Sequence, residues 1–307
     1  LSMNAVTFAH VSDLHLPFEP ILTLAQKFSK RQLSAWSWQR RRALHSPAIL
    51  DALAADLRAY APDHIAVTGD ITNFSLPAEF EQARAWLAAL APPGQLSLVP
   101  GNHDALVPLA TGEGLERWSA WTRSDAGWPF VHHRDRVALI GLNSALPTAP
   151  LLARGRLGAA QLSRLEQVLQ DERDAGRIRI VLVHHPVAAG AVRWRKALAD
   201  AAELREVLRR VGAELVLHGH AREARLDALA GAAEQLGRIP CLCVPSSSAV
   251  PNPRDAAARW HLLRVITDAN TAHAEVLVRQ WSVPAQAFID AAQYTLQLPR
   301  TAPARAP

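Results

Sequence analysis

Residues 95–104 read QLSLVPGNHD, an apolar run followed by polar side chains of the kinds that bind metals or transfer protons. The apolar run predicts a buried strand, and Asn102, His103 and Asp104 follow it directly. In open α/β sheets, ligands bind beyond the carboxyl ends of the strands. We therefore expect this segment to belong to a layered α/β fold and to place a functional site at one edge of a sheet.

Four more segments have the same construction along the chain. They read AVTFAHVSDLH (5–15), HIAVTGD (64–70), IRIVLVHH (178–185) and AELVLHGH (213–220). With residues 95–104, they place six candidate metal ligands at strand ends: Asp13, His15, Asp70, Asn102, His184 and His220. Hard oxygen donors mixed with imidazoles, without thiolates, suit Mn, Fe, Zn or Co.

The order and spelling of these segments resemble the calcineurin-like metallophosphoesterases, whose pattern is DxH, GDxxx, GNHD/E, H and GHxH. The resemblance extends from about Ala5 to about Trp281. It implies a four-layer sandwich in which two mixed β-sheets are flanked by helices. Periodicity alone would also allow an ordinary doubly wound sheet.

The resemblance also implies a role for each residue. One metal would take Asp13, His15 and Asp70, and the other Asp70, Asn102, His184 and His220. Asp70 would bridge two divalent ions about 3.5–4 Å apart, with manganese favoured. His103 would act as a general acid near the leaving group, with Asp104 orienting its ring, and Asn102, His103 and Arg222 would lie near the substrate. His185 and His218 are expected to pack around the site.

Taken singly, most of these motifs have ordinary explanations. Asp13 could cap a turn, Asn102 could be a turn residue after Gly101, and His184 could be a hydrogen-bonded core histidine. GNHD after a strand is the most specific block. All the blocks in order make a chance match improbable.

One position departs from the family pattern, because Arg222 stands where the second histidine of GHxH is expected. With arginine in place of that histidine, the first metal would lose one imidazole ligand and gain a positive charge nearby. Three interpretations stay open: three protein ligands suffice, Arg222 contacts the substrate phosphate, or activity is lost.

The motifs predict one domain over residues 5–283 and a mobile tail over 284–307. Ser46 and Pro47 predict a helix start. Further helices are expected at 77–91, 159–175 and about 196–211. Runs at 136–142, 239–244, 260–266 and 273–281 are expected to form a second sheet.

An insert at about 24–45 follows the first motif and carries two tryptophans, Trp36 and Trp38. Between residues 27 and 42 it has no acid and six basic residues: Lys27, Lys30, Arg31, Arg40, Arg41 and Arg42. It could lie on an anionic membrane or grip an acyl-phosphate substrate. Alternatively, it is a solvated helix whose aromatic side chains pack on the main domain.

Composition adds limits of its own. A net charge of +5 favours anionic partners without separating phosphates, nucleic acid and membranes, and no nucleic-acid partner is singled out. Cys241 and Cys243 are poorly spaced for a disulfide and indicate a reducing compartment. No stretch could span a bilayer, and the first strand leaves no room for a signal peptide. We expect a cytoplasmic protein that can touch a membrane peripherally.

The sequence thus predicts a metal-dependent phosphoesterase that cleaves a phosphodiester or pyrophosphate bond with metal-activated hydroxide. Its substrate would be a phosphate-ester small molecule or a lipid-linked compound. One alternative resembles the enzymes that cleave UDP-2,3-diacylglucosamine in lipid A synthesis. Another is a catalytically silent regulatory protein that binds an anion or a membrane.

Overall fold

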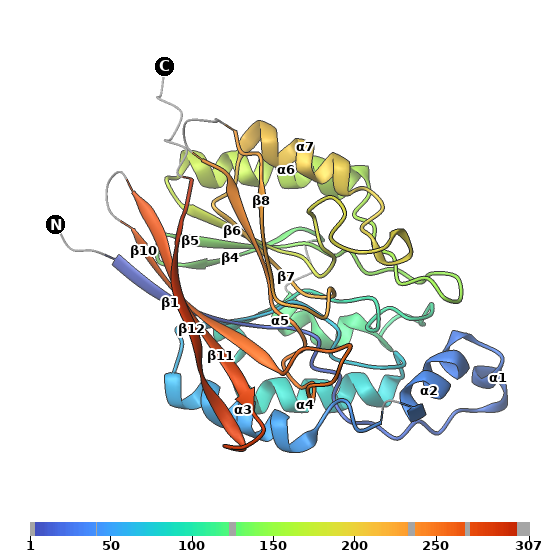
Figure 1. Ribbon diagram of the computed structural model, residues 1–307. Helices are drawn as coiled ribbons and strands as arrows, with labels where there is room; N and C mark the ends of the chain where they lie inside the picture. Colours follow the sequence, from blue (N-terminus) through green and yellow to red (C-terminus); the bar gives the residue numbers. More distant parts are fainter. Residues whose placement is uncertain (1–3, 41, 123–126, 233–236, 268–270, 300–307) are drawn as a thin grey trace.

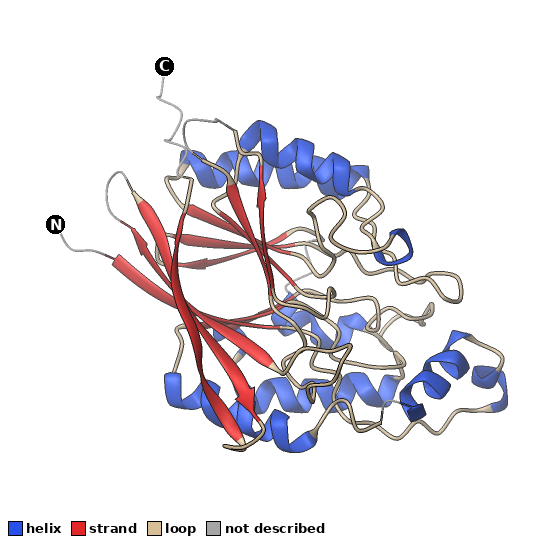
Figure 2. Ribbon diagram, in the orientation of Figure 1, coloured by secondary structure: helices blue, strands red, loops and turns tan. Residues whose placement is uncertain are grey.

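Two six-stranded sheets face each other in the computed structural model, with helices on both outer sides (Figures 1 and 2). The structure describes residues 4–40, 42–122, 127–232, 237–267 and 271–299. The first sheet has the order β12 (Ala287–Gln297), β11 (Ala272–Ser282), β10 (Arg259–Thr267), β1 (Asn4–Val11), β2 (His64–Val67), β3 (Leu96–Leu98). The second has the order β4 (Phe130–Arg134), β5 (Val137–Gly141), β6 (Ile178–Leu182), β7 (Leu215–His218), β9 (Ile239–Cys243), β8 (Arg225–Leu229).

Four helices complete the sandwich. Helices α3 (Pro47–Tyr60) and α4 (Pro77–Leu90) pack on the first sheet, and α6 (Ala159–Asp174) and α7 (Ala201–Val211) pack on the second. A third apolar cluster fills the space between the sheets. The four-layer arrangement of two mixed sheets flanked by helices is therefore confirmed. Shorter helical pieces are η1 (Pro93–Gln95), η2 (Leu115–Trp118) and α5 (Ser119–Thr122).

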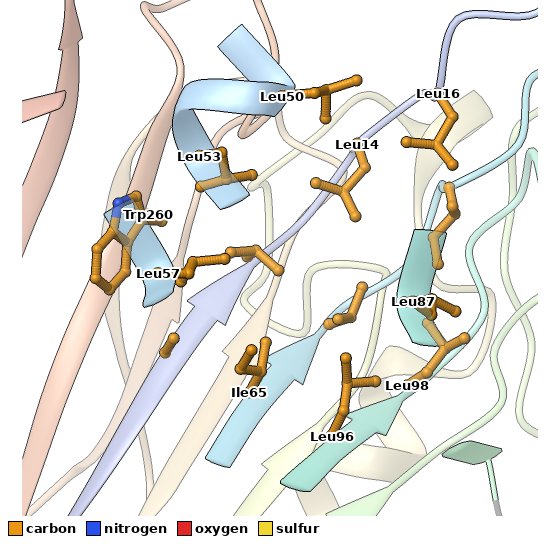
Figure 3. Packing of buried hydrophobic residues seen from close by; sticks show 14 of the residues in the cluster. Leu14, Leu16, Leu50, Leu53, Leu57, Ile65, Leu87, Leu96, Leu98 and Trp260 are labelled. Carbon is orange, nitrogen blue, oxygen red and sulfur yellow. The ribbon is translucent and has the colours of Figure 1, made fainter. Parts of the chain in front are cut away.

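Helix α3 shows how the local sequence sets an element. Pro47 occupies its first turn, and Leu50, Leu53 and Leu57 recur at helical spacing and are buried against the sheet (Figure 3). Ser46 stands at the N-cap with extended backbone, as expected, although its side chain makes no capping hydrogen bond. Ala61 ends the helix in the left-handed conformation, at φ 44°.

Two predictions about the second half of the chain were wrong. Strands β10 and β11 belong to the first sheet, where β10 pairs antiparallel with β1, and only β5 and β9 join the second sheet. The predicted tail contains β12, which pairs with β11 along its length. Strand β12 is an edge strand with few buried side chains, among them Phe288 and Leu296, so its sequence lacks a clear alternation. Residues 300–307 lie outside the described part of the chain.

The strands that precede the motifs share one direction. Strands β1, β2 and β3 are parallel neighbours, and so are β5, β6, β7 and β9. Their carboxyl ends, and the polar motifs that follow them, therefore meet at one side of the molecule. Among the described residues, no helix combines the length and apolar character that a membrane crossing requires.

Candidate metal centre

The loops after the strands are held in strained, closely packed turns. Asp13, His15, Asp70 and His220 all have positive φ angles, between 42° and 65°, which are uncommon for residues other than glycine. The Asp13 amide donates to Gly69 O at 2.9 Å, and the His15 amide donates to Asp70 O at 3.0 Å. Strain of this kind concentrates at functional sites.

Two glycines allow the loops to approach one another. A Cβ atom on Gly101 would lie 2.2 Å from Asp70 Oδ1. One on Gly219 would lie 1.9 Å from Ser12 Oγ and 2.5 Å from Asp13 Oδ2. Any larger residue at either position would push a carboxylate out of the site.

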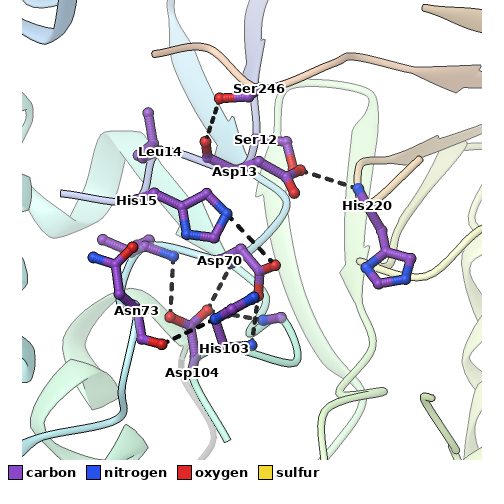
Figure 4. A network of polar contacts seen from close by, with 12 residues as sticks. Ser12, Asp13, Leu14, His15, Asp70, Asn73, His103, Asp104, His220 and Ser246 are labelled. Atoms are coloured by element: carbon purple, nitrogen blue, oxygen red, sulfur yellow. Dashed lines mark hydrogen bonds and ion pairs between the residues drawn. The ribbon is translucent and has the colours of Figure 1, made fainter. Parts of the chain in front are cut away.

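The turns bring five of the polar side chains into two clusters that share Asp70. One cluster joins His15, Asp70 and His103, and the other joins Asp70, His184 and His220, with the donor atoms of each cluster within 4.8 Å of one another. Asp70 Oδ2 lies 3.3 Å from His184 Nε2. It lies 3.9 Å from His15 Nε2 (Figure 4). A carboxylate common to two donor clusters is the arrangement that a bridging ligand requires.

Asp13 and Asn102 lie beside these clusters. Asp13 Oδ2 accepts hydrogen bonds from Ser12 Oγ at 2.7 Å and from the His220 amide at 3.0 Å (Figure 4). Asn102 Oδ1 and His220 Nε2 are buried and have no hydrogen-bond partner. Buried acceptor atoms without partners are costly, and coordination of a cation would satisfy both. This donor set fits divalent metal ions.

His185 and His218 are buried next to the clusters, as expected for packing residues. The His185 ring lies 4.6 Å from the His220 ring, and its Nδ1 pairs with Ser144 Oγ at 2.7 Å. The Nε2 atoms of His185 and His218 also lack partners, so an unpartnered ring nitrogen alone does not identify a ligand. Neither residue joins either donor cluster.

Burial and charge set the protonation states at the centre. Burial would raise the pKa of Asp70, but His184 and His103 outweigh it and hold that pKa well below its usual value. Burial lowers the pKa of His184, but the Asp70 carboxylate and further partners raise it more, and the pKa of His184 reaches about 9. Burial holds the pKa of His15 and His220 well below 6.5, so both present the neutral imidazole that binds metals.

The predicted link between Asp104 and the His103 ring was wrong. The Asp104 carboxylate accepts from the backbone amides of Asp70, Ile71, Thr72 and Gly101, at 2.8–3.0 Å. The His103 ring is instead held by Asn73, whose carbonyl lies 3.0 Å from Nδ1. Asp104 therefore fixes the loop that carries Asp70. Asn73 belongs to the GDxxx block, which was interpreted only for its aspartate.

Arg222 lies beside the centre and is already paired. Its Nη2 is 2.5 Å from Oδ1 of Asp255, a buried carboxylate from the loop between β9 and β10. Asp255 was not foreseen, because nothing near residue 255 resembles a site motif. Since Asp255 balances the guanidinium charge, Arg222 repels a neighbouring cation less than its sequence position suggested.

A cavity of about 280 Å³ opens over the centre. Five of the six predicted ligands line it, namely Asp13, His15, Asp70, Asn102 and His220, while His184 is fully buried. His45 lines it as well, with its ring 4.5 Å from the His15 ring, although no motif of the sequence predicted it there. Lys196 and Arg222 add positive charge to the wall.

The basic insert forms another wall of the cavity. It contains α1 (Leu24–Lys27) and α2 (Lys30–Arg40), and Lys30, Leu33 and Trp38 of α2 line the cavity. Arg31 is buried and donates to the carbonyl oxygens of Phe74 and Ser75, at 2.9 and 2.6 Å. Of the six basic residues in the insert, Arg31 therefore faces the domain, and Arg41 lies outside the described residues.

A sequence model of the calcineurin-like phosphoesterases matches residues 6–221, from the first strand to the residue before Arg222. This chain is a calcineurin-like phosphoesterase. The phosphoesterase is also 28% identical over 222 residues to a probable cyclic nucleotide phosphodiesterase from Synechococcus sp., and the match covers 71% of this chain and 74% of that relative.

Two solved structures show the same fold. A dimetal phosphatase from Danio rerio superposes with a TM-score of 0.62 at 13% identity, covering 95% of this chain and 98% of that one. A purple acid phosphatase from yellow lupin (Lupinus luteus) gives 0.54 at 12% identity, covering 96% of this chain and 54% of that one. Family membership makes the protein a phosphoric-ester hydrolase that uses divalent metal ions.

Proposed function

We propose that this phosphoesterase hydrolyses a phosphodiester or pyrophosphate bond at a centre of two divalent cations, manganese being favoured. The observation that carries the proposal is the position of Asp70 in both donor clusters. Asp13, His15 and Asp70 would hold one ion, and Asp70, Asn102, His184 and His220 the other. Two ions in such a centre supply an activated water and stabilise charge on the phosphoryl oxygens.

His103 is suited to deliver a proton to the leaving oxygen. A carbonyl oxygen only accepts, so Nδ1 of His103 carries the hydrogen that it shares with Asn73 O. In the imidazolium form, Nε2 of His103 would carry the second proton, and His103 lines the cavity into which that proton would be delivered. The His103 amide also donates to Asp70 Oδ1 at 2.7 Å, which couples the position of the proposed acid to that of the bridging carboxylate.

The cavity wall supports an anionic substrate with an organic substituent. Lys196 supplies positive charge for a phosphate, Arg222 supplies guanidinium N–H donors beside it, and the similarity to a probable cyclic nucleotide phosphodiesterase supports a diester. Leu33, Trp38 and Leu152 give the cavity an apolar side, which favours the lipid A-type pyrophosphate substrate as the second candidate. The silent-protein alternative loses its support, because Arg222 is neutralised by Asp255.

Metal stoichiometry and turnover test the proposal together. The wild type should bind two Mn²⁺ per chain and cleave bis-p-nitrophenyl phosphate. Asp70→Asn should lose at least one ion and more than about 10³-fold of turnover, since it weakens both sites at once. His103→Ala should lose roughly 10²–10⁴-fold of turnover while retaining both ions.

Asp171→Asn, on the outer surface of α6, is the matched control and should behave as the wild type. One bound ion in the wild type, or two ions and full turnover in Asp70→Asn, would disprove the shared carboxylate. Loss of metal in His103→Ala would make His103 a ligand. Cyclic nucleotides, glycerophosphodiesters and UDP-diacylglucosamine should then be compared as substrates.

A further inference from the structure

Exposed apolar side chains surround the entrance of the cavity. Ten large hydrophobic side chains are strongly exposed among the described residues, and seven of them lie in three segments next to the cavity: Ile21, Leu24, Phe28, Leu33, Trp36, Leu151 and Trp194. Phe28 is 92% exposed and Leu151 78%. A concentration of this kind, unlike scattered apolar residues, marks a surface that binds something.

Hydrogen bonds connect the three segments into one rim. Lys30 Nζ, in the insert, donates to Thr148 Oγ1 at 2.6 Å and to Leu152 O at 2.7 Å. The next residue, Ala153, donates its amide to Arg195 O at 2.9 Å. Arg195 belongs to η4 (Trp194–Lys196), so the insert, the 148–153 loop and η4 are neighbours. Leu33, Leu151 and Lys196 also line the cavity, which places the rim at its mouth.

The rim is basic as well as apolar. Residues 20–42, 145–156 and 188–198 contain no aspartate or glutamate. Residues 193–196 read Arg-Trp-Arg-Lys, and all four side chains are exposed. Lys27 and Arg40 are exposed on the insert. Helices α1 and α2 stand out from the two sheets at the side where the motif loops gather (Figure 1).

We infer that this rim docks on the surface of an anionic lipid bilayer, with its apolar side chains in the headgroup region and its basic side chains against lipid phosphates. Docking in this way would turn the mouth of the cavity towards the bilayer. Apolar side chains interspersed with Lys and Arg are the composition of peripheral membrane-binding surfaces, where both attractions add. The inference concerns binding and does not depend on the two-metal chemistry proposed above.

A bilayer fits the rim better than a nucleic acid does. Single-stranded nucleic acids bind through aromatic platforms on which bases stack. Phe28, Trp36 and Trp194 are aromatic. The other four exposed apolar residues of the rim are aliphatic and give bases nothing to stack on, whereas all seven gain free energy in the acyl-chain boundary. The rim also lacks a long apolar helix face that would embed the protein deeply, so binding should be reversible and sensitive to salt.

Sedimentation with phosphatidylcholine vesicles containing phosphatidylglycerol tests the inference. Phe28→Ser/Trp36→Ser/Trp194→Ser should lower the partition coefficient about tenfold or more. None of these three side chains lines the cavity, so cleavage of bis-p-nitrophenyl phosphate should stay within about twofold of the wild type. Leu226→Ser/Val283→Ser/Ile289→Ser removes three exposed apolar side chains elsewhere and should leave vesicle binding unchanged.

Charge is tested separately with Arg193→Gln/Arg195→Gln against Arg58→Gln/Arg136→Gln, two exposed arginines away from the rim. Only the first pair should weaken binding to anionic vesicles, and added salt should weaken wild-type binding. Equal binding by the rim and control variants, or equal affinity for purely phosphatidylcholine vesicles, would overturn the inference. So would binding to single-stranded DNA without binding to vesicles.

Discussion

At the scale of single residues, Arg222 and its partner Asp255 set the charge beside the proposed first metal site. Replacing Arg222 with histidine removes a cation, supplies an imidazole and leaves the buried Asp255 carboxylate without its partner. All three changes favour a cation at the first site. We therefore predict that Arg222→His lowers the Mn²⁺ concentration for half-maximal activity by about tenfold or more, measured by titration of the metal-free enzyme.

Arg222→Gln separates charge from coordination, because it removes the cation without adding an imidazole. It should shift the Mn²⁺ requirement in the same direction, but less. Both variants should unfold at lower denaturant, since a buried carboxylate loses its ion pair. An unchanged Mn²⁺ requirement in both variants would show that the side chain at position 222 does not act on the metal, whereas lower turnover at saturating Mn²⁺ would assign Arg222 to the substrate.

The positions of the proposed metal ligands were predictable from the sequence, but the contacts that support the surrounding residues were not. Each ligand follows an apolar run, and parallel strands bring such positions to one edge, so Asp13 and His220 could be placed together. The His103 ring, in contrast, is held by a backbone carbonyl, which leaves no trace in the side-chain pattern. Asp255 reaches Arg222 from a loop whose position depends on the whole second half of the chain.

At the scale of single elements, helix α2 is fixed to the domain by one of its basic residues and one of its tryptophans. The Arg31 guanidinium holds the carbonyl oxygens of Phe74 and Ser75, and the Trp38 ring lies 6.0 Å from the Phe74 ring. A basic residue was read as part of a charged face, although burial makes it an anchor. Helix propensity and charge counts do not reveal which side of a short helix meets the domain.

Arg31→Met should loosen the insert without unfolding the protein. The substitution keeps an apolar stem but leaves two carbonyl oxygens without their donor, a loss of about 1–3 kcal/mol of local stability. Amide hydrogen exchange in residues 24–40 should accelerate about tenfold or more, while exchange in α6 stays unchanged. Arg40→Met, at an exposed position of the same helix, is the control. Equal exchange in the two variants would show that Arg31 is not the anchor.

The sheets show a similar division between local and long-range information. Apolar runs correctly located β5, β9, β10 and β11, because each run is buried. The sheet to which β10 and β11 belong was predicted wrongly. Strand β10 pairs with β1, which lies far away in the sequence, and no local sequence pattern indicates such a pairing. Strand β12 was missed for a different reason: an edge strand needs only a few buried side chains, here including Phe288 and Leu296.

At the scale of the whole molecule, buried histidines link the fold to pH. Eight of the 13 histidines are buried, and four of them lie on strands of the two sheets, away from the candidate metal centre: His10, His64, His132 and His261. His10 and His261 face each other across β1 and β10, with ring centroids 6.0 Å apart. Burial, followed by the charge of Arg259, lowers the pKa of His261 to about 3.

The sign of the resulting pH dependence follows from that shift. The pKa of His261 in the unfolded chain is near 6.5. Below this pH, the unfolded state therefore binds a proton that the folded state does not bind. The contribution of His261 to stability is therefore fully present above pH 6.5 and falls as the pH decreases towards 3. Between pH 7 and pH 5 it should decrease by about 2 kcal/mol.

We predict that His261→Leu removes this part of the acid sensitivity. Urea unfolding in EDTA, which excludes metal binding, should show the wild type losing about 2 kcal/mol more than the variant between pH 7 and pH 5. His273→Leu, at a partly exposed position of β11, should keep the wild-type slope. If the unfolding free energy of His261→Leu changed with pH as much as that of the wild type, the His261 ring would be protonated as readily in the folded protein as in the unfolded chain. Its burial between β1 and β11 would then not exclude the charge.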